Sequence, residues 1–371
     1  MFLRPPMGGV ETYVRRVVGE LVGLRPDLRL TVFLGPAGLD ALRGEPWAGH
    51  VELVTHRLLG PRFLGAASEV VALPRLAARR GVDLLHSVAM TGPLGGSFAH
   101  VVTVGDLIWM HEPASVGAAT RWTWGALVPR VARHADRVLT YSEASRDDVV
   151  GLLGVAVDRV DAVPLGPGAE PGEATPEAEV RERYDLGDGP LVLTVSIKRP
   201  SKNLEALIAA TGGVVERFPS AVVVMPGRPT AHDARLRELA ARHGVVASLR
   251  FPGHVPAADL EGLYRAASCF VFPSLYEGFG LPILEAMRRG VPVACARASS
   301  LPEVAGEAAR YFDPRRPEEL SAAICQLLED RGLAARLAEA GRERAAQFSW
   351  RRTAEGTLAA YERAWAQSRE S

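Results

Sequence analysis

Two glutamates flank a glycine-rich turn in PSLYEGFGLPILEAMRRGVPVA, residues 273–294. Glu277 precedes the turn Gly278-Phe279-Gly280, and Glu285 follows after seven intervening residues in a stretch with helical periodicity. Backbone N–H groups at the start of a helix suit an anion such as phosphate, and carboxylates accept hydrogen bonds from hydroxyls. The spacing predicts a site for a phosphorylated sugar or nucleotide, unless the turn only connects a strand to a helix.

The chain has only two lysines, Lys198 and Lys202, among 43 Lys and Arg residues. Both lie in VSIKRPSKN, residues 195–203, and Lys202 stands between a strand-like run and the helical stretch NLEALIAA. Either this stretch needs a compact ammonium, which a planar guanidinium would not replace, or both lysines are exposed side chains that stand at a helix start by chance. The residues of this stretch alone leave both alternatives open.

Other motifs that could carry chemistry are incomplete. The turn lacks the third glycine of a dinucleotide fingerprint, and it is not a GxxxxGK[ST] phosphate loop. No HExxH or paired-histidine spacing for a metal site is present. The isolated cysteines, which form no CxxC pair, predict buried thiols in a reducing compartment: Cys269, Cys295 and Cys325. The paired arginines are typical of solvated helix faces: Arg79-Arg80, Arg288-Arg289 and Arg351-Arg352.

The elements that must position these residues alternate between short β-branched runs and amphipathic stretches. This alternation predicts βαβ units, parallel sheets and an α/β fold. The expected strands are 28–35, 51–56, 82–87, 101–106, 137–142, 191–196, 221–227, 248–253, 269–274 and 291–296. The expected helices are 10–24, 67–80, 143–153, 203–217, 257–267, 282–290 and 317–347.

A linker composition rich in Pro, Gly, Ala and Glu, residues 164–179, separates the two series of strands. We predict a first doubly wound domain over 1–166, a second over 167–348, and a helix over 349–371 that finishes the second domain or packs back on the first. In such sheets a ligand binds beyond the carboxyl ends of the strands. Two domains that face each other would make a cleft between them, where a ligand site is common.

Composition excludes several classes of protein. The 371 residues carry 43 basic and 43 acidic side chains, which argues against a dedicated nucleic-acid binder. No apolar stretch approaches the roughly 20 residues of a membrane span, and no signal peptide precedes the first helix. We expect a cytoplasmic protein, with peripheral contact at the inner face of a membrane left open.

The spacing of two glutamates around GFGLP resembles the signature of retaining glycosyltransferases of family 4 (glycosyl transferases group 1), which have the GT-B architecture of two facing Rossmann-like domains. Residues 251–314 are similar to that family almost throughout, residues 134–166 resemble its interdomain region, and MGGVETYVRRVVGEL, residues 7–21, resembles its first loop and helix. The resemblance covers nearly the whole chain. It implies an enzyme that transfers a sugar from a nucleotide-diphosphate donor, with no obligatory metal and no cofactor.

The resemblance also implies roles for individual residues. Glu277 would contact the hydroxyls of the transferred sugar, Glu285 would bind the nucleotide ribose, and Lys202 would neutralise the diphosphate. The remaining positions that it implies for donor binding are Gly8, Gly9, Gly278, Phe279, Gly280 and Leu281. His86 and Asp106 are the expected acceptor-side residues.

The chain departs from the family pattern at three places. Many relatives carry an Arg in the Lys202 loop where this chain has Ile197 or Ser201, so Lys198 or Arg199 is expected to supply that charge. Gly105 stands where relatives have a histidine before the aspartate, and His86 and His111 are candidates to replace it. Only MFLRPP precedes the first glycine-rich loop, which suggests a truncated first strand.

We therefore expect a retaining transferase that moves a hexose from GDP-mannose or a UDP-sugar to a hydroxyl of a glycan, a lipid-linked sugar or a metabolite. The stretch around Asp106 looks most like mannosyltransferase relatives. The competing hypothesis is a catalytically impaired relative that binds a nucleotide or a partner glycosyltransferase. A nucleotide-sugar epimerase of the same architecture is a third hypothesis.

Overall fold

The computed structural model describes residues 9–55 and 62–369, and the chain folds as two compact units. The first unit comprises residues up to Leu107, Gly117–Gly166 and Phe348 onward. The second comprises Ile108–Val116 and Pro167–Gln347. Sequence analysis places its domain boundary at the same position, between residues 166 and 167, but it assigns 108–116 to the first domain.

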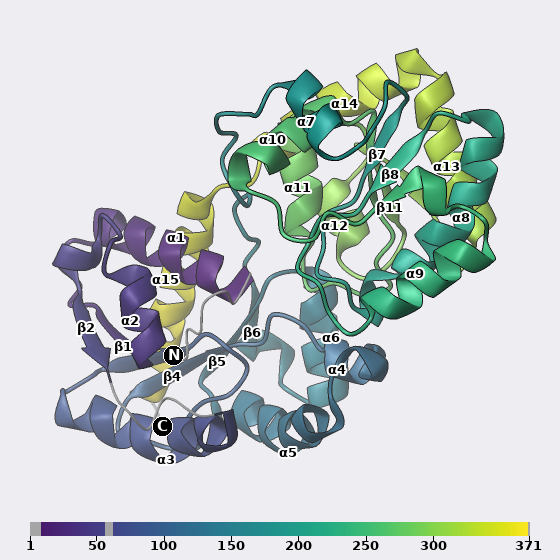
Figure 1. Ribbon diagram of the computed structural model, residues 1–371. Helices are drawn as coiled ribbons and strands as arrows, with labels where there is room; N and C mark the ends of the chain where they lie inside the picture. The colour runs from purple at the N-terminus through teal and green to yellow at the C-terminus, as the bar shows by residue number, and fades with distance from the viewer. Residues whose placement is uncertain (1–8, 56–61, 370–371) are drawn as a thin grey trace. The chain divides into compact units, whose positions relative to one another are not determined.

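The first unit alternates strands and helices in chain order, as the short β-branched runs predict (Figure 1). Its strands are β1 (Thr31–Leu34), β2 (Glu52–Thr55), β3 (Leu84–Ser87), β4 (Ala99–Thr103), β5 (Arg137–Thr140) and β6 (Val160–Ala162). Its helices are α1 (Gly9–Leu24), α2 (Pro36–Leu42), α3 (Arg62–Arg79), α5 (Ala118–His134), α6 (Glu143–Leu153) and α15 (Trp350–Ser368).

All strand pairs described in the first unit are parallel, and they form two separate pairings. One sheet has the order β1-β2 and the other has the order β3-β4-β5-β6. An apolar cluster of Phe33, Val54, Leu73 and Leu85 contains side chains of both pairings and of α3. The expected truncation of the first strand concerns residues 1–6, which lie outside the described residues.

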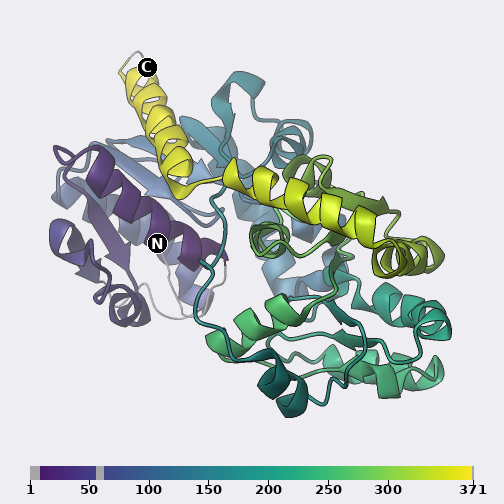
Figure 2. The same ribbon diagram turned by 90° about the horizontal axis from the view of Figure 1, so that it is seen from above.

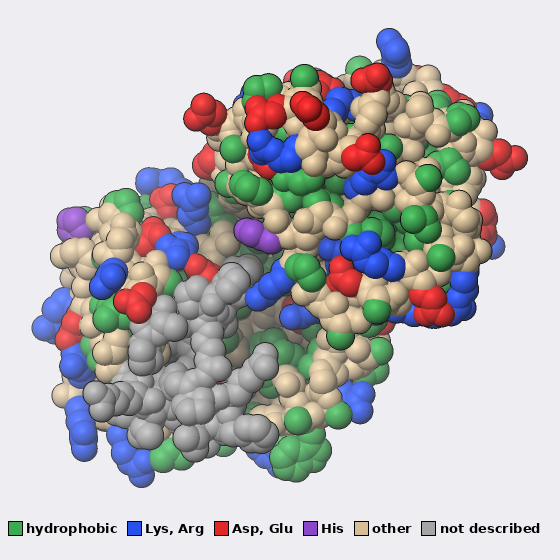
Figure 3. Space-filling view, viewed as in Figure 1, with side chains coloured by type: hydrophobic (Ala, Val, Ile, Leu, Met, Phe, Trp, Pro, Cys, Tyr) green, Lys and Arg blue, Asp and Glu red, His purple; other side chains and the backbone are tan. Residues whose placement is uncertain are grey.

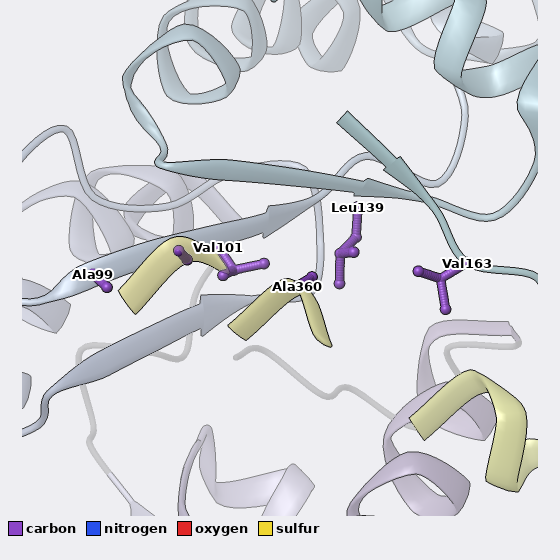
Figure 4. Packing of buried hydrophobic residues seen from close by; sticks show 6 residues of the cluster. Ala99, Val101, Leu139, Val163 and Ala360 are labelled. Atoms are coloured by element: carbon purple, nitrogen blue, oxygen red, sulfur yellow. The ribbon is translucent and has the colours of Figure 1, made fainter. Parts of the chain in front are cut away.

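The C-terminal helix α15 packs within the first unit, alongside α1 and against the sheet (Figures 1 and 2). Small side chains make this close approach possible, since Ala360 and Ala364 on α15 lie in one buried cluster with residues of β4 and β5. Figure 4 shows this cluster at close range. Its members are Ala99, Val101, Leu139, Val163, Ala360 and Ala364.

The second unit contains a parallel sheet of six strands within the described residues. The strands are β7 (Leu191–Leu193), β8 (Val222–Val224), β9 (Leu249–Arg250), β10 (Cys269–Phe272), β11 (Val293–Ala296) and β12 (Ala309–Phe312). The helices are α4 (Ile108–His111), α7 (Glu177–Arg183), α8 (Leu204–Arg217), α9 (Asp233–Arg242), α10 (Ala257–Ala266), α11 (Leu281–Arg288), α12 (Leu301–Ala305), α13 (Pro317–Glu329) and α14 (Arg331–Ala346).

Strand order in this sheet is β12-β11-β10-β7-β8-β9, the order of a doubly wound fold. Every residue of β7, β8, β10 and β11 is buried, which is typical of parallel strands covered on both faces. Figure 1 shows α8 and α13 on one side of the sheet and α10 and α11 on the other. The α/β class and the parallel sheets expected from the sequence are confirmed.

Sequence analysis misses some elements and merges others. It has no counterpart for the helices α2, α4, α5, α7, α9 and α12 or for the strands β6 and β12. The helix expected over 317–347 is two helices, because Asp330 ends α13 and its side chain accepts a hydrogen bond from the Leu333 N–H at the start of α14.

Candidate donor-binding site

The carboxyl ends of β7 and β10 bring the two chemistry-bearing stretches together. These strands pair in parallel, with Cys269 opposite Val192 and Phe270 opposite Leu193. Lys202 ends a short 3₁₀ turn, Pro200–Lys202, after β7, and the glycine-rich turn follows β10. Because carboxyl ends of parallel strands meet at one edge of a sheet, both stretches lie at the edge where doubly wound folds bind ligands.

Two neighbouring serines hold the glycine-rich turn in place. The Ser299 hydroxyl accepts a hydrogen bond from the Glu277 N–H at 2.8 Å. The Ser300 hydroxyl donates to the carbonyls of Glu277 at 2.9 Å and Phe279 at 2.7 Å. The backbone on both sides of Gly278 is therefore fixed by the loop between β11 and α12, which preorganises it for a ligand.

Gly280 is required at the end of the turn. Its φ is 122°, a conformation that other residues rarely adopt, and an added Cβ would lie 3.0 Å from Leu301 Cδ2. The next residue, Leu281, begins α11, and Pro282 occupies the first turn, where a missing N–H costs nothing. The N-terminus of this helix therefore lies at the same edge of the sheet as Lys202.

Asn203 connects the Lys202 loop to the rest of the edge. It adopts a left-handed conformation with φ 52° and precedes α8. Its side-chain amide donates hydrogen bonds to the carbonyls of Pro273 at 3.1 Å and Pro314 at 2.7 Å. These bonds fix the start of α8 against the end of β10, so the position of Lys202 relative to the glycine-rich turn is set by the fold.

Lys202 and Glu277 form an ion pair with each other. The ammonium Nζ lies 2.5 Å from Glu277 Oε1, and the side chains are only 19% and 13% exposed. The ammonium also lies 5.6 Å from the centre of the Phe272 ring. A diphosphate that binds Lys202 must compete with this carboxylate, and its binding would free Glu277 to accept hydrogen bonds from sugar hydroxyls.

Glu285, on α11, receives hydrogen bonds from two directions. Oε1 accepts from the Ala169 N–H at 3.2 Å, and Oε2 accepts from the Tyr264 hydroxyl at 3.1 Å. Burial raises the pKa of the carboxyl, and these two hydrogen bonds oppose that rise. Each oxygen keeps a second lone pair, so the carboxylate can still accept from ribose hydroxyls.

A buried ion pair between Arg289 and Glu261 packs next to Glu285 and helps to hold it in place. Arg289 and Glu261 lie 2.7 Å apart, and each side chain is 5% exposed. The Arg289 guanidinium also donates to the Glu285 carbonyl at 2.9 Å and lies 4.7 Å from the centre of the Tyr264 ring. The expectation that Arg289 is a solvated surface residue is therefore wrong, because the helix turns it into the protein where Glu261 compensates its charge.

Lys198 does not share the environment of Lys202. Its side chain is fully buried, and its ammonium donates to the Gly227 carbonyl at 3.1 Å and lies 3.9 Å from Asp233 Oδ1. Burial lowers the pKa of this ammonium. The prediction of an exposed lysine is therefore wrong. The two partners of the ammonium also argue against the predicted donor contact. Arg199 is exposed beside Lys202 and remains a predicted donor ligand.

His86, expected on the acceptor side, is part of a buried hydrogen-bond network. One ring nitrogen bonds the Tyr361 hydroxyl at 2.8 Å and the other bonds the Thr103 hydroxyl at 2.7 Å. Burial lowers its pKa to about 3, so the ring is neutral at physiological pH. Both nitrogens have partners within the first unit, which argues against the expected acceptor contact.

The other residues expected to contact substrate in the first unit are placed as follows. Asp106 is partly exposed after the carboxyl end of β4, and Gly9 is the exposed first residue of α1. Gly8 lies outside the described residues. A buried carboxyl that the sequence did not indicate is Glu69 on α3, which accepts a hydrogen bond from the Thr91 hydroxyl and whose pKa burial raises to about 7.

Residues 108–116 reach the Lys202 loop although they precede α5 in the chain. The Ser115 hydroxyl accepts a hydrogen bond from the Ser201 N–H at 2.7 Å. The His111 ring stacks on Tyr276 at 4.4 Å with an angle of 14° between the planes. Ser201 and Tyr276 are the chain neighbours of Lys202 and Glu277. No motif in the sequence predicts these two contacts.

Metal and membrane features were sought within residues 9–55 and 62–369. Over these ranges no three His, Cys, Asp or Glu side chains gather as they would around a metal ion. No helix in the same ranges combines the length and apolarity needed to cross a bilayer. On the face seen in Figure 3, acidic and basic side chains are interspersed, in keeping with their equal numbers.

Comparison with known proteins matches both units to glycosyltransferases. The family model Glycosyltransferase Family 4 matches residues 7–167, and Glycosyl transferases group 1 matches residues 177–344. O-antigen chain mannosyltransferase B of Escherichia coli is 36% identical over 61% of this chain, and the match spans only 60% of that relative. MMP alpha-(1->4)-mannosyltransferase of Mycolicibacterium hassiacum is 32% identical over 78% of this chain and 72% of its own length.

A solved structure agrees on the fold. Anabaena Alr3699/HepE in complex with UDP and glucose superposes with a TM-score of 0.74 at 18% identity, covering 96% of this chain and 97% of that one. A structural match at 18% identity shows the fold alone. The two family models and the 32% identical relative show the family. The chain therefore belongs to glycosyltransferase family 4 and has the GT-B fold.

Proposed function

We propose that the protein transfers a hexose, with retention of anomeric configuration, from a nucleotide-diphosphate sugar to a hydroxyl of an acceptor. The observation that carries the proposal is the pairing of Lys202 with Glu277 at the carboxyl edge of β7 and β10, next to the N-termini of α8 and α11. A cation and two helix starts favour a diphosphate, and a carboxylate beside them favours sugar hydroxyls.

Each residue of the edge has a part in this proposal. Lys202, with Arg199 nearby, neutralises the diphosphate as negative charge develops on it during cleavage of the glycosidic bond. Glu277 orients the sugar through its hydroxyls, and Glu285 accepts from the ribose. The acceptor hydroxyl attacks the anomeric carbon, and its proton passes to an oxygen of the departing diphosphate on the same face. We propose that no metal ion is required.

The relatives support a preference among donors. Two curated relatives are named mannosyltransferases, which favours GDP-mannose. The similarly folded Alr3699/HepE was crystallised with UDP and glucose, which keeps UDP-sugars as the second choice. The acceptor is proposed to be a glycan, a lipid-linked sugar or a small metabolite bound by the first domain.

A thermal-shift titration tests the donor site. We expect GDP-mannose or one UDP-sugar to stabilise the protein by about 2.7 kcal/mol at 100 times its dissociation constant, in the presence of a chelator. Glu285→Ala should abolish most of this shift, because it removes the ribose acceptor. Glu355→Ala, on the exposed face of α15, is the control and should respond as the wild type does.

A folded protein that shows no shift with any donor would contradict the proposal. It would favour the alternative of a catalytically impaired relative. Gly105 motivates this alternative because a glycine offers no side chain to the substrate after β4. Binding of donor without release of nucleotide diphosphate would lead to the same alternative. Release of diphosphate together with a glycosylated product excludes both the impaired relative and an epimerase.

We also propose peripheral contact with an anionic membrane surface through α5. Trp122 is 79% exposed, and Arg121 and Arg130 line the same surface groove. An aromatic ring flanked by arginines suits the interface of anionic lipids. The protein should float with phosphatidylglycerol vesicles at low salt, and Trp122→Ala should weaken the association. Equal recovery with phosphatidylcholine vesicles, or none with either lipid, contradicts the proposal.

A further inference from the structure

Tyr141 lies at the carboxyl edge of the sheet in the first unit, directly after β5. Gly105 follows the neighbouring strand β4. Strands β4 and β5 pair in parallel, with Thr103 opposite Leu139, so Tyr141 and Gly105 lie next to each other at this edge. The Ser145 hydroxyl, in the first turn of α6, donates to the Gly105 carbonyl at 3.1 Å and ties the two loops together. Tyr141 and Gly105 therefore occupy the edge where a parallel sheet binds its ligand.

The Tyr141 ring fills the space beside Gly105. A Cβ added at Gly105 would lie 2.6 Å from Tyr141 Cε2, which is closer than real Cβ contacts, and 3.0 Å from Cδ2. On another side, the Tyr13 ring lies 5.6 Å away, centre to centre. Gly105 is thus the residue that allows this ring position, and the aromatic contact with Tyr13 holds the ring there.

The Tyr141 hydroxyl is covered and has no hydrogen-bond partner in the part of the chain that the structure describes. Neighbouring tyrosines differ in this respect, since the Tyr13 hydroxyl bonds Thr357 at 3.2 Å and the Tyr361 hydroxyl bonds His86 at 2.8 Å. An unpaired buried hydroxyl costs stability, and a ligand that accepts its hydrogen bond would offset this cost.

The chemistry of this hydroxyl is that of a hydrogen-bond donor. Burial raises the pKa of Tyr141 well above its ordinary value, and Tyr13 and the Asp106 carboxylate act in the same direction. The phenol therefore stays protonated at physiological pH. Asp106 follows Gly105 directly, so a donor and a carboxylate stand side by side at the edge.

We propose that the Tyr141 hydroxyl donates a hydrogen bond to an oxygen of the acceptor sugar, beside Asp106, and so helps to bind the acceptor in the first unit. This inference rests on the proposed transferase function. The side chain as a whole is partly exposed, but its hydroxyl is covered, so the groups over it must move when the acceptor enters. Acceptor binding would then satisfy a donor that the fold leaves unpaired.

Tyr141→Phe tests the proposal because it keeps the ring and removes only the hydroxyl. In the free protein we expect the melting temperature to stay equal or to rise by about 1–3 °C, since an unpaired buried hydroxyl is lost. With GDP-mannose as donor and methyl α-D-mannoside as acceptor, kcat/KM for the acceptor should fall about fivefold to tenfold, the effect of one neutral hydrogen bond. Slow hydrolysis of the donor without acceptor should be unchanged.

Tyr361→Phe is the matched control. It removes a hydroxyl that already has a partner in His86, so it should lower the melting temperature and leave the KM of the acceptor unchanged. The proposal is overturned if Tyr141→Phe lowers the melting temperature as the control does, or if it leaves kcat/KM for the acceptor unchanged.

Failure of the transferase function gives a different result. Wild-type protein would then neither hydrolyse nor transfer sugar from GDP-mannose or UDP-hexoses. In that case saturation-transfer NMR with methyl α-D-mannoside decides the inference about Tyr141. Binding by the wild type that weakens in Tyr141→Phe supports it, and equal binding or no binding overturns it.

Discussion

Lys202→Ala is expected to lower kcat by about 10²–10³-fold, which corresponds to about 3–4 kcal/mol of lost transition-state stabilisation. The departing diphosphate gains negative charge as the glycosidic bond breaks, and Lys202 is the ammonium fixed at the edge that receives it. The Lys202 side chain is only 19% exposed, so in the variant water would screen the negative charge of the diphosphate less well than the ammonium does. Turnover of donor and acceptor under saturating conditions measures the effect.

Lys198→Ala is the matched control, because it removes the other lysine four positions away. Its ammonium is buried against the Gly227 carbonyl, so we expect a lower melting temperature with near-normal kcat per folded molecule. Circular dichroism of both variants separates loss of fold from loss of chemistry. Equal kcat for Lys202→Ala and wild type would contradict the role of the ammonium, as would a large loss of kcat in folded Lys198→Ala.

Arg289→Met is expected to lower the free energy of unfolding by about 3–5 kcal/mol, because it leaves Glu261 as an uncompensated buried charge. Both side chains are 5% exposed, and the guanidinium also contacts Tyr264 and the Glu285 carbonyl. Urea denaturation measures the change. Donor affinity should fall as well, since Tyr264 and Glu285 lose a shared neighbour.

A second substitution separates charge from packing in this pair. Arg289→Met combined with Glu261→Gln should recover part of the loss, because the double variant buries no unpaired charge. Arg351→Met removes a partner from an exposed ion pair with Glu355, and about 0–1 kcal/mol is expected there. A loss for Arg289→Met no larger than for Arg351→Met would show that the buried pair does not stabilise the fold.

Sequence analysis assigned Lys202 and Glu277 to one donor site through the resemblance to glycosyltransferase family 4. The structure brings the two side chains to 2.5 Å from each other at the ends of neighbouring strands. The turn at Gly280 could be predicted from local spacing, because a glycine shortly before Pro282 is typical of a turn that leads into the first residues of a helix.

The residues that the sequence misplaced are those whose environment depends on distant parts of the chain. Lys198 is buried by the loop that carries Gly227, and His86 is occupied by Tyr361 on the C-terminal helix. Arg289 is paired with Glu261 on another helix. Local periodicity gives the direction of a side chain on its own element, but the partner that covers it is set by tertiary packing.

The segment 108–116 shows the same limit at the level of domains. Its chain position predicts membership of the first domain, yet Ser115 and His111 contact Ser201 and Tyr276 of the second unit. Helix α5, which follows it, was missed because its apolar residues follow the helical period weakly and Pro129 interrupts the pattern.

Calorimetric titration of GDP and GMP into wild-type protein and Lys202→Ala is the most direct test of the central claim, that Lys202 binds a donor diphosphate in exchange for Glu277. The account predicts that the wild type binds GDP at least tenfold more tightly than GMP, or UDP more tightly than UMP if the donor is a uridine sugar. It predicts that Lys202→Ala loses this preference while it still binds the monophosphate. Equal affinity for mono- and diphosphate in the wild type, or an unchanged preference in the variant, would contradict it.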